Sequence, residues 1–132
     1  MKLNPMPQII AGKRVILIDD SIVRGTTTRK IARMLYDAGA SEVHILISSP
    51  PVTYPDFYGI NLPSQQDLIA YHMTPDEIRK HLGVDSLGYL SYDGMIRATG
   101  MPAGSFSTHC FDGIYPIGIG KEQDKIVQVT YA

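Results

Sequence analysis

The stretch that decides the fold is Val15-Ile16-Leu17-Ile18-Asp19-Asp20-Ser21-Ile22-Val23-Arg24-Gly25-Thr26-Thr27-Thr28. Its four apolar residues, 15 to 18, are typical of a strand that is buried on both faces, as in a parallel sheet. Two carboxylates end this strand, a loop closing on Gly25 follows, and helical spacing begins at Thr27. A strand, an acidic pair and a Gly/Thr loop that opens a helix predict a phosphate site at the mouth of an α/β sheet.

The helix after this loop and the strand after that helix extend the pattern. One face of the predicted helix carries the apolar residues Ile31, Met34, Leu35 and Ala38. One of the threonines at 26–28 is expected to cap its start, and Gly39 to end it in a left-handed conformation. Residues 43–47 form a second apolar run, which predicts another buried strand. Strand, helix and strand in this order predict a right-handed βαβ unit with parallel strands.

The remainder of the chain predicts shorter elements. Further strands are expected at 57–60, at 87–90 and around Phe106. Further helices are expected at 63–70, from a capping box at Thr74 and Glu77 to Gly83, and from Ser91 to Gly100. Residues 1–13 are interpreted as a strand remnant or linker. We therefore predict an α/β fold with a mainly parallel sheet flanked by helices and an incomplete set of strands, in a domain at 1–120 followed by a tail at 121–132.

Bulk properties exclude several classes of protein. A chain of 132 residues, 44% of them hydrophobic, is long enough for one domain with a core. The net charge of −1 and the absence of long basic runs argue against a nucleic-acid partner. No apolar run approaches the roughly 18 residues of a membrane span, and the N-terminus lacks the pattern of a signal peptide. Because Cys110 is the only cysteine, a reducing cytoplasm is the expected location.

The loop residues suit a phosphorylated sugar. The helix start supplies unpaired N–H groups and positive potential, Gly25 removes a Cβ that could block close approach, and the threonines add hydroxyl donors. Asp19 and Asp20 would repel a phosphate, so hydroxyl groups or Mg²⁺ are their expected partners. Together these features predict a site for ribose 5-phosphate carrying a diphosphate. The Gly-Lys-Ser/Thr ending of a Walker loop is missing.

An Asp-Asp pair before a helix can also be an ordinary strand end, so the length of the match decides between the two interpretations. The string from Asp19 to Thr27 resembles the phosphoribosyl pyrophosphate signature of type I phosphoribosyltransferases. Four further strings, Ser49-Pro50-Pro51, Phe57-Tyr58-Gly59-Ile60, Leu68-Ile69-Ala70 and Asp76-Glu77-Ile78-Arg79, resemble the amidophosphoribosyltransferases within that class. The likeness extends from Lys2 to about Tyr115. The fold that it implies is part of a type I phosphoribosyltransferase domain.

The resemblance implies an activity and a set of site residues. In that family, ammonia released from glutamine displaces pyrophosphate from C1 of phosphoribosyl pyrophosphate, and the product enters de novo purine synthesis. Asp19 and Asp20 would bind the ribose and Mg²⁺ and favour the positive charge that develops on the sugar, which makes them the catalytic residues. The phosphate would be held by Ser21, Ile22, Val23, Arg24, Gly25, Thr26 and Thr27. Purine nucleotides would compete for the same pocket as inhibitors.

The chain also departs from the family. Nothing in it matches the glutaminase domain or the first half of the phosphoribosyltransferase domain. We therefore expect a C-terminal part that is inactive in catalysis by itself and whose unpaired sheet edges favour a homo-oligomer. Some family members bind an iron–sulfur cluster through cysteines at the segments corresponding to residue 56 and residues 105–113. This chain has Asp56 and the single Cys110 there, so no cluster is expected.

Other interpretations stay open at this level. One is a regulatory or ligand-sensing module that uses the phosphoribosyltransferase fold, and another is a phosphoribosyltransferase acting directly on a base. Among single residues, Cys110 is expected to be a structural thiol and not a nucleophile. Arg24 could either touch the ligand or order the loop.

Overall fold

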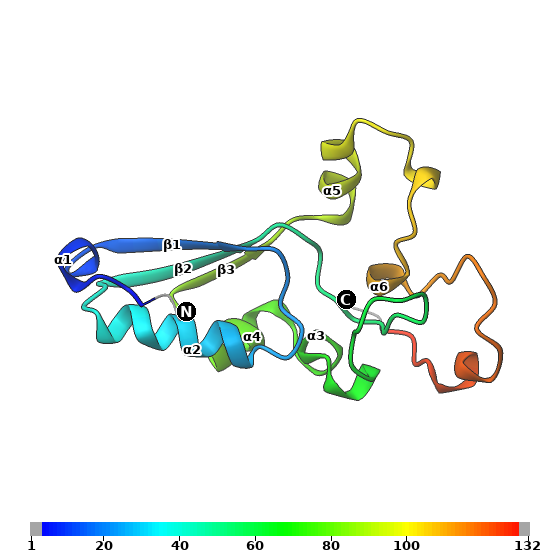
Figure 1. Cartoon of the computed structure of the whole chain (residues 1–132), viewed down its shortest axis with the longest axis horizontal. Helices are drawn as coiled ribbons and strands as arrows, with labels where there is room; N and C mark the ends of the chain where they lie inside the picture. The colour runs from blue at the N-terminus through cyan, green and yellow to red at the C-terminus, as the bar shows by residue number, and fades with distance from the viewer. Residues whose placement is uncertain (1–3, 130–132) are drawn as a thin grey trace.

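Three parallel strands form the centre of the computed structural model, which describes residues 4–129. The strands are β1 (Arg14–Asp19), β2 (Glu42–Ile47) and β3 (Ser86–Tyr89), in the order β1-β2-β3. Helices α2 (Thr26–Asp37) and α4 (Pro75–Leu82) lie on the same face of this sheet (Figure 1). The α/β class and the parallel pairing predicted from the sequence are confirmed.

The register of the strands places the candidate site. Arg14 pairs with Glu42 and Asp19 with Ile47, so β1 and β2 end side by side. The N–H of Ser48 then donates to the carbonyl of Asp19 at 3.0 Å, which ties the start of the next loop to the end of β1. Because the strands are parallel, every loop that follows a strand leaves from the same edge of the sheet. The acidic pair and the loop to α2 therefore lie at the carboxyl edge.

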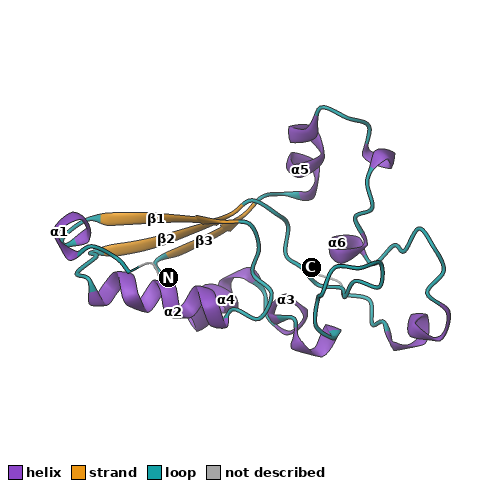
Figure 2. Ribbon diagram, viewed as in Figure 1, coloured by secondary structure: helices purple, strands orange, loops and turns teal. Residues whose placement is uncertain are grey.

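Only one face of the sheet is covered. Val43 and Ile45 are fully buried beneath the helices, together with Ile78 of α4 and Ala32 of α2. On the opposite face, apolar side chains are exposed to solvent: Ile16 is 61%, Ile18 71% and Leu46 47% exposed. The prediction of strands buried on both faces is wrong for residues 4–129, since α2 and α4 lie on the same face and no described element packs on the other (Figure 2).

The remaining helices are short and mostly lie beyond the carboxyl edge of the sheet (Figure 2). They are α1 (Pro7–Ile10), the 3-10 helix η1 (Gln65–Asp67), α3 (Ile69–His72), α5 (Tyr92–Thr99), η2 (Ala103–Ser105), α6 (His109–Asp112) and η3 (Gly120–Lys125). Residues 1–13, interpreted as a strand remnant or linker, contain the single turn of α1 in their described part. No helix in the part of the chain that the structure describes is long and apolar enough to cross a membrane.

The predicted capping signals are confirmed in two helices. In α4 the N–H of Glu77 donates to Oγ1 of Thr74, and the N–H of Thr74 donates to the Glu77 carboxylate at 2.7 Å, which completes a capping box. In α5 the hydroxyl of Ser91 accepts the N–H of Gly94 at 3.1 Å, and Gly100 ends the helix in a left-handed conformation. Local hydrogen bonding therefore sets both boundaries.

Three predicted elements are wrong. Residues 57–60 form turns and not a strand, because one carboxylate oxygen of Asp56 accepts the N–H groups of both Tyr58 and Ile60. Phe106 follows the single turn of η2 and belongs to no strand. The helix expected at 63–70 is divided into η1 and α3, since Leu68 between them has an extended backbone.

Candidate functional site

A hollow of about 640 Å³ opens where β1 ends and α2 begins. It is lined by Asp19, Asp20, Ser21, Val23, Arg24, Gly25, Thr26, Thr27, Thr28, Asn61 and Pro63. The structure therefore gathers the predicted site residues around one cavity, with one exception. The side chain of Ile22 is 1% exposed and belongs to the core, so this residue can offer only its backbone to a ligand.

The loop presents a continuous series of free donors. The N–H groups of residues 22–28 have no hydrogen-bond acceptor among residues 4–129. The first helical bond of α2 is donated by the next residue, Arg29, to the carbonyl of Gly25 at 2.9 Å. Unpaired N–H groups at a helix start attract anions, with a stabilisation of about 0.3–1 kcal/mol per charge and up to roughly 2 kcal/mol when partly buried. The arrangement suits a phosphate group.

The cap of α2 differs from the prediction. Gly25, and not a threonine, occupies the N-cap position, with φ +73° and no side-chain capping bond. The absence of a Cβ at Gly25 also avoids a clash with the core, because an added Cβ would lie 2.8 Å from Cδ1 of Ile69. The N–H of Ile69 donates to the carbonyl of Val23 at 2.9 Å in the same region. Glycine therefore permits the loop to pack on α3.

The threonines divide into two groups. Thr26 and Thr27 are exposed and line the hollow, so their hydroxyl groups can reach a ligand. Thr28 also lines the hollow but is only 4% exposed.

Arg24 also lines the hollow, and its guanidinium lies 3.4 Å from the Asp67 carboxylate, with the Arg24 side chain 61% exposed. Such an exposed pair contributes about 0–1 kcal/mol to stability, so Arg24 is free to turn towards a ligand.

The acidic pair keeps part of its coordination capacity. Oδ1 of Asp19 accepts the N–H of Asp20 at 3.0 Å, and Oδ1 of Asp20 accepts the N–H of Ser21 at 2.7 Å. The second oxygen of each carboxylate has no partner among the described residues. Hard oxygen ligands at a site that also takes a phosphate fit Mg²⁺, which binds through one or two carboxylates plus substrate oxygens. The same free oxygens fit sugar hydroxyl groups as acceptors.

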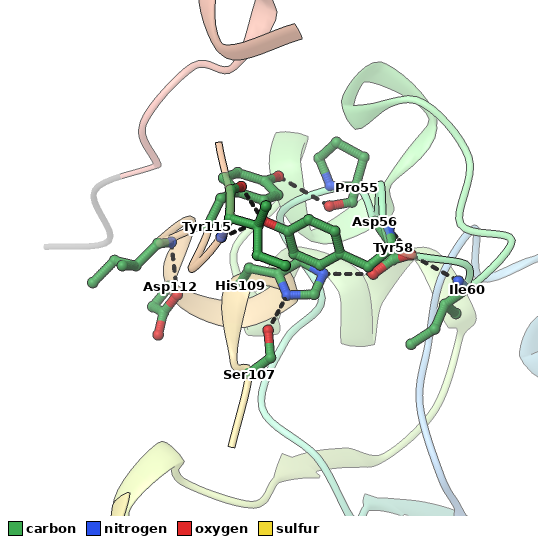
Figure 3. A network of polar contacts seen from close by, with 10 residues as sticks. Pro55, Asp56, Tyr58, Ile60, Ser107, His109, Asp112 and Tyr115 are labelled. Atoms are coloured by element: carbon green, nitrogen blue, oxygen red, sulfur yellow. Dashed lines mark hydrogen bonds and ion pairs between the residues drawn. The ribbon is translucent and has the colours of Figure 1, made fainter. Parts of the chain in front are cut away.

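A second polar cluster lies outside the hollow. Nε2 of His109 lies 2.6 Å from Oδ2 of Asp56, with the two side chains 5% and 1% exposed (Figure 3). Nδ1 of His109 lies 2.7 Å from the hydroxyl of Ser107. We call the Asp56–His109 pair the clasp. The sequence analysis missed it, because no local pattern connects two residues that are 53 positions apart.

The surroundings of the clasp shift the pKa values of Asp56 and Cys110. Burial raises the pKa of the Asp56 carboxyl, but the N–H groups of Ile60 and Tyr58 and the His109 side chain outweigh burial and leave this pKa below its usual value. Burial, with the Asp56 and Asp112 carboxylates nearby, raises the pKa of the Cys110 thiol to about 11. The thiol is therefore protonated at neutral pH, in agreement with the prediction of a structural cysteine.

One set of potential metal ligands occurs at the clasp. Among residues 4–129, ligand atoms of Asp56, His109 and Cys110 lie within 4.8 Å of one another. The carboxylate and the imidazole already bind each other, and the thiol holds its proton, so a metal would have to displace both interactions. The chemistry of these residues fits a hydrogen-bonded Asp56–His109 pair beside a protonated thiol better than a metal site.

Comparisons with known proteins agree on one enzyme. The chain is 57% identical over 122 residues to amidophosphoribosyltransferase of Synechococcus elongatus, covering 92% of this chain and 25% of that protein. It is 48% identical over 127 residues to the Mycobacterium tuberculosis amidophosphoribosyltransferase, covering 92% of this chain and 24% of that protein. No family model matches the chain.

Solved structures give the same result. The glutamine phosphoribosylpyrophosphate amidotransferase of B. subtilis, complexed with ADP and GMP, superposes with a TM-score of 0.85 at 44% sequence identity, covering 92% of this chain and 28% of that chain. The chain thus spans about a quarter of the length of the curated relatives it matches. It is homologous to this part of the amidophosphoribosyltransferases and shares its fold.

Proposed function

We propose that this chain is the phosphoribosyl pyrophosphate-binding part of an amidophosphoribosyltransferase. The observation that carries the proposal is that one hollow is lined both by residues 23–28, whose six N–H groups are free, and by Asp19 and Asp20, which each keep a free oxygen. The free N–H groups suit the 5-phosphate, which only accepts hydrogen bonds. The free carboxylate oxygens suit ribose hydroxyl groups and Mg²⁺.

The proposed reaction replaces the pyrophosphate at C1 of the sugar with ammonia derived from glutamine, which forms 5-phosphoribosylamine. Asp19 and Asp20 would stabilise the positive charge that develops on the ring as the pyrophosphate leaves. Mg²⁺ would be held by the same two carboxylates and would neutralise the leaving group. The match covers 25% of the Synechococcus elongatus relative, and we propose that glutamine hydrolysis and complete catalysis need a further region of such an enzyme. An iron–sulfur cluster is not part of this proposal.

Purine nucleotides are proposed as competing ligands. A nucleoside monophosphate carries the same ribose 5-phosphate unit, so it would place its phosphate against residues 22–28 and its sugar near Asp19. The B. subtilis relative was solved with ADP and GMP, which supports nucleotides as ligands of this kind of site. We expect GMP to displace phosphoribosyl pyrophosphate from the hollow.

Self-association is proposed from the uncovered face of the sheet. Ile16 and Ile18 of β1 and Leu46 of β2 expose an apolar surface that parallel sheets normally bury. A second copy of the chain would remove this surface from water. A monomer by light scattering at micromolar concentration would contradict this part of the proposal. The cytoplasmic location remains a prediction.

Isothermal titration calorimetry tests the proposed ligand. We expect saturable binding of phosphoribosyl pyrophosphate in the presence of Mg²⁺, which the double variant Asp19→Asn/Asp20→Asn loses. The matched control is Asp37→Asn, which removes an exposed carboxylate from the opposite end of α2 and should bind as the unmodified chain does. Equal binding by the double variant and the control would contradict the assignment of the acidic pair.

A further inference from the structure

The hollow has an outer wall that the sequence signature does not include. Asn61 and Pro63 line it together with the loop, although they lie more than thirty positions further along the chain. The side-chain amide of Asn61 is exposed and has no hydrogen-bond partner among residues 4–129. Its position in the hollow therefore comes from the tertiary structure alone, and its polar atoms are available to a ligand.

The backbone before Asn61 is held in a defined shape. Oδ1 of Asp56 accepts the N–H groups of Tyr58 at 2.9 Å and of Ile60 at 2.7 Å. Gly59 between them has φ +124°, a conformation that side chains disfavour. The N–H of Leu62 donates to the carbonyl of Ile60 at 2.8 Å, so the turn continues to both sides of Asn61. The carboxylate of Asp56 thus directs the path of the chain into the hollow.

The clasp holds the carboxylate of Asp56 in place. Its second oxygen binds His109 of α6, and the ring of Tyr58 packs edge-on against the imidazole with centroids 4.9 Å apart (Figure 3). The hydroxyl of Tyr58 donates to the carbonyl of Ile117 and accepts its N–H. The hydroxyl of Tyr115 donates to the carbonyl of Pro55 at 2.9 Å. Hydrogen bonds from residues 107–117 to residues 55–58 therefore stabilise the turn that leads to Asn61.

The chemistry of the hollow indicates what Asn61 does there. The phosphate end of a sugar phosphate already meets the N–H groups of residues 22–28, whereas its hydroxyl groups need acceptors. Asp19 and Asp20 each retain one free oxygen, and Mg²⁺ would compete for both. An amide carbonyl is an acceptor without charge, so it can lie near a phosphate without repelling it.

We propose that Asn61 accepts a hydrogen bond from a sugar hydroxyl of the bound ligand, and that the clasp is the positioning device that holds Asn61 in the hollow. The inference rests on the proposed function, because it needs a sugar phosphate in this site. It adds a specificity-determining residue outside the loop signature, and it gives α6 a role in ligand binding.

Two ligands separate this inference from the proposed function. Ribose 5-phosphate and inorganic phosphate share the anion, but only the first has sugar hydroxyl groups. We expect Asn61→Ala to weaken binding of ribose 5-phosphate about five- to tenfold, as for one lost hydrogen bond, and to leave binding of inorganic phosphate unchanged. The control Gln66→Ala removes an exposed amide on the same segment that does not line the hollow, and it should change neither affinity.

Each other outcome is decisive. Equal loss for both ligands would mean that Asn61 binds the phosphate, and unchanged affinity for both would mean that it binds neither; either result overturns the inference while leaving the proposed function intact. Failure of the unmodified chain to bind either ligand would contradict the proposed function itself.

The positioning role requires a separate measurement. His109→Gln should weaken ribose 5-phosphate binding about as much as Asn61→Ala, at a temperature where circular dichroism shows both variants folded. In the Asn61→Ala background the same change should cost no further affinity, because the clasp would act through a side chain that is already absent. Additive losses would contradict the positioning role. If His109→Gln does not fold, Tyr58→Phe replaces it, since this change removes only the hydroxyl contact with Ile117.

Discussion

The loop after β1 and the clasp differ in whether their polar groups have hydrogen-bond partners within the chain. In the loop from Asp19 to Thr28, seven successive N–H groups and two carboxylate oxygens lack partners among the described residues, and all of the residues that carry them except Ile22 border an open hollow. In the clasp, both carboxylate oxygens of Asp56 and both ring nitrogens of His109 have partners, and both side chains are buried. Unsatisfied groups next to solvent are available to a ligand, whereas satisfied groups away from solvent hold the chain together.

This difference separates effects on binding from effects on stability. Changes to the exposed side chains that line the hollow should alter ligand affinity with small changes in the free energy of unfolding, whereas Gly25 also packs on the core and is a separate case. Changes in the clasp should alter the free energy of unfolding first, and ligand affinity only through the segment that leads to Asn61. The predictions below test this separation.

The largest expected effect is on the clasp. Asp56→Ala leaves a buried imidazole without its carboxylate and removes the acceptor of two backbone N–H groups. Breaking a buried pair in this way typically costs about 3–5 kcal/mol, and we expect a loss of this size in the free energy of unfolding. Urea denaturation followed by circular dichroism measures it. Asp56→Asn, which keeps one oxygen acceptor for the N–H groups of Tyr58 and Ile60, should lose less, and a loss below about 1 kcal/mol for Asp56→Ala would contradict the structural role.

Gly25 tests whether the loop depends on packing as well as on backbone conformation. Gly25→Ala should lower the free energy of unfolding by about 2–4 kcal/mol, because the left-handed conformation is disfavoured and the new Cβ would lie 2.8 Å from Ile69. Gly100 is the matched control, with φ +68° and no atom within 4 Å of an added Cβ. Gly100→Ala should cost only the conformational part, about 1–2 kcal/mol. Equal losses at the two positions would show that the contact with Ile69 is unimportant.

Acid should weaken the clasp in a defined pH range. The pKa of Asp56 is lower in the folded chain than the ordinary value of about 3.9 for an unfolded aspartate. Its contribution to stability is therefore fully present above about pH 4 and is lost as the pH falls through the lower folded-state pKa. We expect the free energy of unfolding to fall less steeply below pH 4 in Asp56→Asn than in the unmodified chain. Parallel pH profiles would contradict this assignment.

The smallest expected effect on stability is at Arg24. Its contact with Asp67 is long and exposed, so Arg24→Ala should change the free energy of unfolding by less than about 0.5 kcal/mol. Thermal denaturation of this variant beside the unmodified chain is sufficient to check it. A larger loss would mean that Arg24 orders the loop.

Local sequence signals predicted the parts of the fold that local interactions determine. The strand at 14–19, the helix after it and the capping box at Thr74 are all present. The predicted loop residues gather at one hollow because they are contiguous and follow a buried strand. Such elements depend on neighbouring residues, which the sequence displays directly.

Features that depend on distant residues could not be predicted. A run of apolar residues has the same pattern whether one or both faces of its sheet are covered, so the exposed face of Ile16 and Ile18 gave no signal. The partner of Asp56 is 53 positions away, and Asn61 comes to the hollow although it lies more than thirty positions after the loop. The N-cap at Gly25 reflects its contact with Ile69, which is equally non-local.

The central claim is that the free N–H groups of residues 22–28 receive the phosphate of the ligand. A two-dimensional ¹⁵N–¹H NMR titration with ribose 5-phosphate and Mg²⁺ tests it most directly, because each amide reports separately. We expect large, saturable shifts of the amide signals of residues 22–28, with the amides of Tyr58 and Ile60 that bind Asp56 nearly unchanged. Saturable shifts confined to other parts of the chain, or no shifts at millimolar ligand, would contradict it.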